Sequence, residues 1–246
     1  TLNNNGSDSV YLTTQRNGVA TAIAPSPSDP NVCYIYAYGG VNGDGTYLNT
    51  YEWASITKNP DGSQSLSAFE TSNDPIGPTG FMDGNIWVVT PNDTAEVTPD
   101  RVYLYFSGGV DIANSDSSVL YTGFLDTGSA DGDLGVIAEE KLGYQSPRSG
   151  ASALDANGYL YILGGLTVSN SKIVNTDSSG NLTYDVDLDR LVFAPNSLGS
   201  GSLTQRRAYA GSADESAFFY IGGGLTGYDD ITSEPILTTT VERNTK

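Results

Sequence analysis

Short apolar runs that end on paired glycines dominate the pattern of the chain. The clearest is Gly-Tyr-Leu-Tyr-Ile-Leu-Gly-Gly at 158–165, and comparable runs lie at 32–40, 101–109 and 217–224. Each run is apolar on both faces and too short for a helix, which predicts a strand buried on both sides. Their second glycines lie at positions 40, 109, 165 and 223, at spacings of 69, 56 and 58 residues. Repetition at this period predicts an array of similar supersecondary units.

Weaker strand signals surround each run in a fixed order. In the first unit an inner strand is expected within 16–25, and two strands are expected after the run, at 47–56 and 64–70. The matching strands are predicted at 85–90, 118–125 and 134–139 in the second unit, at 148–154, 187–193 and 201–204 in the third, and at 206–211 and 237–243 in the fourth. The fourth unit lacks a fourth strand of its own, and a short strand at 10–14 is expected to supply it.

The glycines at the ends of the runs are expected to serve backbone geometry. Glycine reaches positive φ without strain and lets two backbones approach closely, so we expect positive φ at Gly165. The residues assigned this structural role are Gly39, Gly40, Gly108, Gly109, Gly164, Gly165, Gly222 and Gly223.

Composition agrees with a β-protein. The 246 residues include 29 Gly and 16 Tyr but one Met, and no stretch has sustained helical periodicity, so the fold class expected is all-β. An all-β chain of this length is often one domain.

One segment resembles a named repeat. Pro147-Arg-Ser-Gly-Ala-Ser-Ala-Leu-Asp-Ala-Asn-Gly-Tyr-Leu-Tyr-Ile-Leu-Gly-Gly165 is similar to a kelch repeat: an arginine with small residues, a short turn, and a tyrosine-bearing strand that ends in Gly-Gly. The resemblance covers nearly the whole chain, is strongest in the third unit, and is degraded in the second, where no arginine precedes the inner strand. Tyr51 and Trp53 lie too close together for the family spacing, and Tyr121 has no matching Trp.

The resemblance implies a kelch-type β-propeller of four-stranded antiparallel blades, with four blades in this chain near 16–70, 80–140, 148–204 and 206–246. Kelch propellers usually have six or seven blades. Residues 1–246 are therefore either one closed domain, with 10–14 as its closing strand, or part of a larger propeller whose further blades come from elsewhere in the chain or from another subunit.

Charge narrows the class of partner. The formal net charge of −18 opposes binding to a phosphate backbone or an anionic membrane surface, so neither nucleic acid nor membrane insertion is expected.

Cys33 is the one cysteine of the sequence, so an internal disulfide is excluded. The chain begins at Thr1, as a processed chain or a piece of a longer one would, and we expect an extracellular or cell-surface location. Three sequons, at Asn5, Asn92 and Asn181, are about what chance predicts.

Catalytic and metal chemistry has little support in the sequence. The absence of histidine excludes Ser-His-Asp triads and His-ligated metals. Acidic residues gather at Asp185, Asp187 and Asp189, and in Gly-rich turns at Asn42 and Asp44, the Asp131/Asp133 pair and the Asp229/Asp230 pair. Calcium is the ion that such oxygen ligands suit, but no segment forms a complete loop such as the EF-hand, so we expect no cofactor and a solvated acidic surface.

Arginines at the starts of inner strands carry the binding hypothesis. Arg16, Arg148 and the Arg206/Arg207 pair are expected to converge, either to satisfy loop carbonyls or carboxylates of neighbouring blades, or to form a basic site for an acidic ligand. In kelch proteins that bind peptides, the binding face is formed by such segments and by the loops after the double glycines. The resemblance places these residues at Asn42, Asp44, Tyr47, Asp111, Asn114, Arg148, Ser149, Arg207, Tyr228 and Asp230.

The function expected is a non-enzymatic recognition or adhesion module for a protein or glycan. Two alternatives stay open: a structural subunit of an extracellular or surface assembly, and a propeller glycosidase that uses carboxylates and converging arginines.

Overall fold

The computed structural model describes most of the chain. The described residues are 10–72, 74–90, 100–107, 109–111, 120–129, 131–134, 138–140, 149–156, 159–167, 172–173, 177–187, 190–195, 203, 205–206, 208–215, 218–228, 232 and 234–245. All regular structure in these ranges is β, and every strand pair is antiparallel. The all-β class predicted from the sequence is confirmed.

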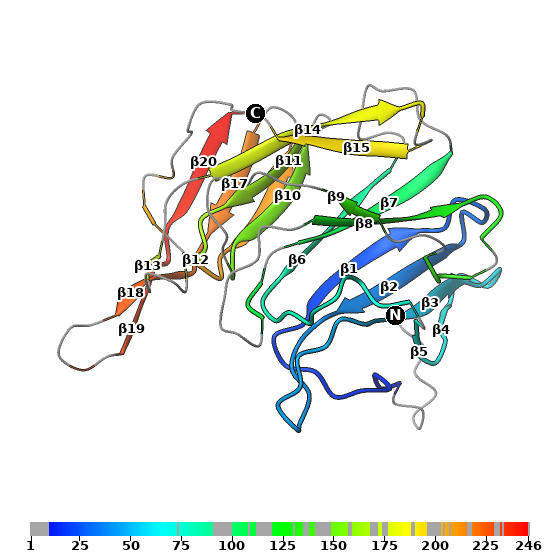
Figure 1. Cartoon of the computed structure of the whole chain (residues 1–246). Helices are drawn as coiled ribbons and strands as arrows, with labels where there is room; N and C mark the ends of the chain where they lie inside the picture. Colours follow the sequence, from blue (N-terminus) through cyan, green and yellow to red (C-terminus); the bar gives the residue numbers. More distant parts are fainter. Residues whose placement is uncertain are drawn as a thin grey trace.

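The strands form four sheets that follow one another along the chain (Figure 1). The first sheet consists of β1 (Ala20–Pro25), β2 (Val32–Tyr38), β3 (Tyr51–Lys58) and β4 (Gln64–Leu66), with β5 (Glu70–Thr71) also paired to β3. The second consists of β6 (Asn85–Val89), β7 (Arg101–Ser107), β8 (Leu120–Asp126) and β9 (Ala138–Glu140). The third consists of β10 (Ser152–Ala156), β11 (Tyr159–Leu163), β14 (Asp177–Asp185) and β15 (Arg190–Pro195).

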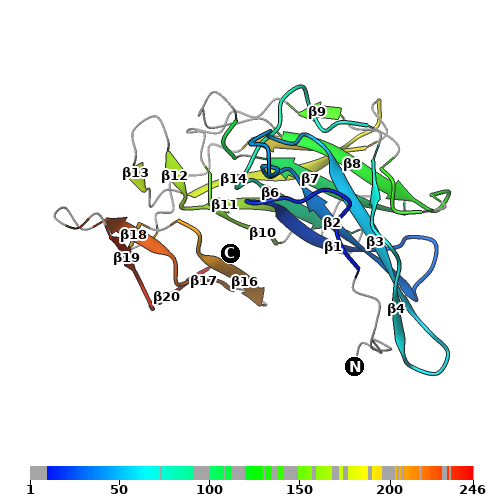
Figure 2. The ribbon, with the colours of Figure 1, turned by 90° about the horizontal axis from the view of Figure 1, so that it is seen from below.

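The fourth sheet and two small hairpins complete the described fold. In the fourth sheet, the described strands are β16 (Gly211–Glu215), β17 (Phe218–Gly222) and β20 (Val241–Thr245), so β20 lies at its edge. The hairpins are β12 (Leu166–Thr167) with β13 (Lys172–Ile173), and β18 (Leu225–Tyr228) with β19 (Pro235–Leu237). First strands of neighbouring sheets lie against one another: β1 contacts β6, β6 contacts β10, and β10 contacts β16. Viewed from below, the sheets are stacked side by side in this order (Figure 2).

The core lies between successive sheets, which explains why the repeated runs are apolar on both faces. Along β7, Leu104 and Phe106 pack in a cluster with Tyr36 and Tyr38 of the first sheet. The alternate residues of β7 pack in a second cluster with Leu160 and other residues of the third sheet. Because neighbouring side chains on a strand point to opposite faces, β7 contributes to two cores at once.

A loop of the second sheet is anchored on tyrosines of the first. The Tyr36 hydroxyl donates to the Gly132 carbonyl (2.7 Å), and the Tyr51 hydroxyl donates to Asp133 Oδ1 (2.5 Å) while accepting from the Leu134 amide (2.8 Å). Burial raises the pKa of both tyrosines, and the bond to Asp133 raises that of Tyr51 further. Asp133, considered as a calcium ligand from the sequence, therefore joins two sheets.

Several strands lie at other positions along the chain than predicted. The third strand of the third sheet is β14, and residues 190–195 form the fourth, whereas 187–193 and 201–204 were expected for these roles. Apart from Leu182 and Tyr184 this strand is polar or glycine, so it has little apolar signal, and its place is set by backbone pairing with β11 and β15. Asp187 lies in the turn between these strands, so it does not share a strand face with Asp185; Asp189 lies outside the described residues.

Residues 10–14 form no strand. The Thr13 and Thr14 amides donate to the Glu52 carboxylate of β3, at 2.6 and 3.0 Å, so this segment lies against the first sheet. In the fourth sheet the strand after β17 is β20 at 241–245, a later position than the 237–243 predicted.

Candidate functional site

Four equivalent bridges place the starts of the sheets beside the loops that follow the double glycines. In each, the backbone of a residue just before the first strand pairs antiparallel with the residue directly after the glycines. We call the side of the molecule that carries them the bridge face; its pairs are Asn17–Val41, Met82–Val110, Ser149–Leu166 and Ala208–Leu225. The two kinds of segment proposed to form a binding face thus lie together in every sheet.

We call the residue of each bridge that precedes a first strand the lead-in position. The residue directly after it has a left-handed backbone, and these four residues link successive sheets. Their φ angles are 68° at Gly18, 56° at Asp83, 56° at Gly150 and 54° at Tyr209. The Asp83 amide donates to the Gly18 carbonyl (2.8 Å), Gly150 to Asp83 (3.0 Å) and Tyr209 to Gly150 (2.6 Å). We call this series of residues the left-handed ladder. It holds the four sheets in register at the bridge face.

The double glycines are required by close backbone contact. Gly40, Gly109 and Gly165 have φ of 89°, 97° and 106°, so the positive φ expected at Gly165 is present. A Cβ on Gly109 would lie 2.5 Å from the Met82 carbonyl oxygen, which belongs to the bridge. In the fourth sheet the pair with positive φ is Gly223–Gly224, while Gly222 ends β17. The sequence analysis placed this pair one residue too early, at Gly222–Gly223, because three glycines follow one another there.

Arg16 is buried in a network within the first sheet, not displayed at a mouth. Its guanidinium forms an ion pair with Glu52 (Nη2–Oε1 3.0 Å), and both side chains are inaccessible to solvent. Nη1 donates to the carbonyls of Gly39 (2.9 Å) and Thr50 (2.8 Å). Of the structural roles expected for these arginines, satisfaction of loop carbonyls is what the structure shows at Arg16, but its carboxylate partner lies in its own sheet and not in a neighbouring one.

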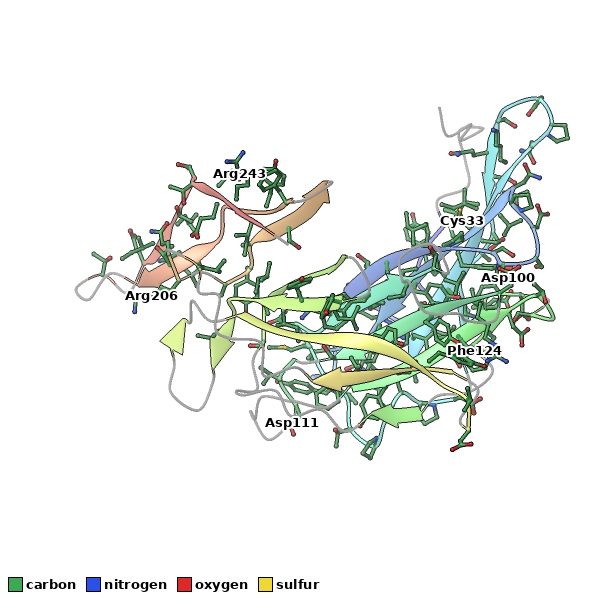
Figure 3. The ribbon with its side chains drawn as sticks, turned by 90° about the horizontal axis from the view of Figure 1, so that it is seen from above. Cys33, Asp100, Asp111, Phe124, Arg206 and Arg243 are labelled. Carbon is green, nitrogen blue, oxygen red and sulfur yellow. The ribbon has the colours of Figure 1, made fainter. Side chains whose placement is uncertain are left out.

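Arg206 is exposed. It lies beside the β18–β19 hairpin (Figure 3), where its Nε donates to the Thr226 carbonyl (3.0 Å). Arg148 and Arg207 lie outside the described residues.

The loop residues proposed from the resemblance have mixed surroundings. Asn42 Oδ1 accepts from the amides of Asp44 (3.0 Å) and Thr46 (2.9 Å), so its side chain shapes its own turn. Asp44 is exposed and Tyr47 is half-buried. Ser149 is buried, with its hydroxyl directed at the Leu166 carbonyl, so a ligand on the surface does not reach it.

The remaining proposed residues are only partly described. Asp111 is half-buried, directly after Val110, and Figure 3 shows it far from Arg206. For Tyr228 the backbone is described, as the last residue of β18. Asn114, Arg148, Arg207 and Asp230 lie outside the described residues.

Two residues that the sequence did not single out form the most distinctive feature of the bridge face. Asp83 and Tyr209 occupy the ladder positions that are glycine in the first and third sheets, and they are the non-glycine residues with positive φ in the described part of the chain. The Tyr209 hydroxyl donates to Asp83 Oδ2 (3.1 Å), and the tyrosine remains 51% exposed. Aligning the four lead-in segments on Gly18 and Gly150 would have found both.

Tyr209 is held in this conformation by its neighbours. A Cβ on Gly150 would lie 2.6 Å from the Tyr209 ring, so the ring covers the glycine of the third sheet. A bulky side chain in the left-handed region is strained, and such residues cluster at functional sites. The site therefore presents a carboxylate and an aromatic face, fixed by backbone bonds to neighbouring sheets.

The described residues were compared with what a metal site and a membrane-spanning helix require. Within the described residues, no three acidic or cysteine side chains gather as a metal site would need. The same residues contain no helix of the length and hydrophobicity that a membrane crossing requires.

Comparison with known proteins supports the fold alone. No protein-family model matches the sequence, and no curated protein matches it either. Among solved structures, the chain is similar to one in a cryo-electron-microscopy structure of RAG in complex with one melted RSS and one unmelted RSS. The TM-score is 0.61 at 15% sequence identity, and the match covers 92% of this chain. The chain spans 65% of the length of the protein it matches.

Proposed function

We propose that the four sheets are blades of a kelch-type propeller. The same strand order in three successive sheets, the contacts between their first strands, and the repeated bridge after each double glycine support this arrangement. A propeller of this kind gathers its lead-in segments and loops on one face, where ligands commonly bind.

We propose that the protein is a non-enzymatic recognition module that binds a protein or glycan partner on the bridge face. The observation that carries this proposal is the Asp83–Tyr209 pair. Two solvent-accessible side chains, one of them a tyrosine strained by its left-handed backbone, occupy positions where the other two sheets have glycine. The ladder bonds are made by the backbone and would persist with glycine, so the ladder itself does not require these side chains.

The test is a screen for ligands, followed by a variant that keeps the backbone conformation. The protein is screened against a glycan array and a displayed peptide library, and each ligand found is titrated against Asp83→Asn/Tyr209→Asn. Asparagine tolerates the left-handed region, so this variant is expected to melt like the parent. Loss of binding without loss of stability supports the proposal. Unchanged binding, or turnover in a panel of chromogenic glycosides, contradicts it.

A glycosidase receives less support. Glu52, which the structure places beside Arg16, is buried and engaged by two backbone amides and the guanidinium, so it is closed to a sugar. Catalysis would need two accessible carboxylates on either side of a scissile bond.

A structural subunit is the second candidate, favoured by apolar surface on the last part of the chain. Ile236, Leu237 and Val241 are exposed on β19 and at the start of β20, and β20 is an edge strand. Exposed apolar residues near an edge strand of the described sheet are typical of assembly contacts. Native mass of the parent and of Leu237→Ser/Val241→Ser tests this: an assembly should dissociate in the variant, and a monomeric parent excludes it.

A further inference from the structure

We infer that the group recognised at the Asp83–Tyr209 pair is a cation, carried by an arginine or lysine side chain of a basic peptide segment. This inference rests on the proposed function and names its ligand class. It differs from the expectation of a basic site for an acidic ligand: of the arginines named there, Arg16 is buried in an ion pair inside the first sheet, and Arg148 and Arg207 lie outside the described residues.

The backbone of Asp83 is fixed, and no described cation pairs with its carboxylate. Its backbone is held on both sides, by the bond from its amide to Gly18 and by the bond it accepts from Gly150. Oδ2 accepts the Tyr209 hydroxyl. An ionised carboxylate has about four acceptor sites and no donor. Arg16–Glu52 is the one ion pair observed between described residues. No described arginine or lysine therefore pairs with Asp83.

The Tyr209 ring offers the second half of a cation site. Half of this residue is open to solvent, while its hydroxyl is turned to Asp83. The face of an aromatic ring attracts a cation, most often a guanidinium. The same protein uses this contact internally: the Arg101 guanidinium lies 4.4 Å from the centre of the Phe124 ring, and that of Arg243 lies 4.6 Å from that of Phe218. A side chain that lies along Tyr209 brings its charge to Asp83.

Charge favours a cation over a neutral or acidic ligand. A neutral glycan that covered Asp83 would desolvate a carboxylate without neutralising it, which is costly. An acidic peptide would meet the same carboxylate and a protein of net charge −18. A basic segment neutralises the carboxylate with a charge-assisted bond and is attracted from a distance by the net charge.

The experiment uses a fluorescein-labelled peptide, Gly-Arg-Arg-Arg-Arg-Gly, and follows its fluorescence anisotropy at low and at physiological salt. Asp83→Asn is expected to weaken binding by about 10- to 100-fold, the range of a charge-assisted hydrogen bond. Tyr209→Leu is expected to weaken it by about 3- to 10-fold through loss of the ring face. Tyr209→Phe keeps that face and is expected to stay within about twofold.

The matched control separates a site from general attraction. Asp61→Asn removes the same charge from an exposed turn between β3 and β4, and is expected to change binding by less than about twofold. If Asp61→Asn weakens binding as much as Asp83→Asn, the peptide is held by net charge and the inference is overturned.

Two further probes distinguish this inference from the proposed function. A Glu-containing peptide of the same length and a chitin tetrasaccharide are titrated in parallel. If either probe binds in a Tyr209-dependent way while the arginine peptide does not bind, the inference of a cationic ligand is wrong and the proposed recognition site stands. If ligands bind but none depends on Asp83 or Tyr209, both proposals fail.

Discussion

The replacement of Gly109 by alanine measures what the close approach at the bridge face contributes to stability. Gly109 has φ of 97°, and an added Cβ would lie 2.5 Å from the Met82 carbonyl oxygen and 3.1 Å from the Phe81 Cβ. Gly45→Ala is a matched control, because Gly45 has φ of 80° with no atom within 4 Å of the same Cβ position. The pair therefore isolates the clash from the conformational cost.

The magnitudes follow from the contacts. Forcing a residue with a Cβ into the left-handed region costs about 1–2 kcal/mol at either site. At Gly109 the backbone must also move away from Met82, which weakens the two bridge bonds between Met82 and Val110, at 3.0 and 2.9 Å. Each bond contributes about 0.5–1.5 kcal/mol, so the clash adds about 1–3 kcal/mol. Gly45→Ala is expected to cost about 1–2 kcal/mol, and Gly109→Ala about 2–5 kcal/mol.

Urea denaturation followed by tryptophan fluorescence measures both free energies of unfolding. Trp53 and Trp87 are buried in the first and second sheets, so their emission reports the packing on either side of the bridge. Any benefit from restricting the unfolded chain is the same for both glycine-to-alanine changes and cancels in the comparison. If the two variants lose equal stability, the double glycine serves conformation alone and the close approach carries no energy.

Three further outcomes are expected. Arg16→Ala leaves the buried Glu52 carboxylate unpaired and should cost about 3–5 kcal/mol in urea denaturation; a loss below about 1 kcal/mol would contradict the buried network. Ile162→Asp places an unpaired charge at a 4% exposed site in β11 and should unfold the protein, as judged by circular dichroism, whereas Ile23→Asp on β1, 59% exposed, should melt near the parent. Burial raises the pKa of three tyrosines, so the stability that their protonated form contributes is complete below about pH 10. Above that pH the free energy of unfolding should fall by about 1.4 kcal/mol per pH unit for each tyrosine. Tyr51→Phe should reduce that slope, and an unchanged slope would contradict this account. The three are Tyr36, Tyr38 and Tyr51.

Arg16 shows where sequence reasoning on the site succeeded and where it stopped. The expected role of satisfying loop carbonyls is observed, whereas the carboxylate that it binds lies in its own sheet and not in a neighbouring blade, where it was expected. The sequence did not name Glu52 as its partner. That choice depends on β3 lying beside β2, so that Arg16, Gly39, Thr50 and Glu52 meet within one sheet.

Periodicity and composition by themselves determined the all-β class, the four repeated runs and the special backbone at the glycines, because alternation, residue type and φ preference are local properties of the chain. The polar strand β14 escaped this reasoning, since its position is set by backbone bonds to strands on either side. The tertiary structure alone decided that Asp83 and Tyr209, 126 residues apart, share a hydrogen bond. Their contact exists because three backbone bonds join the ladder from sheet to sheet; an alignment of the repeats marks the two positions, but it does not record that these bonds bring them together.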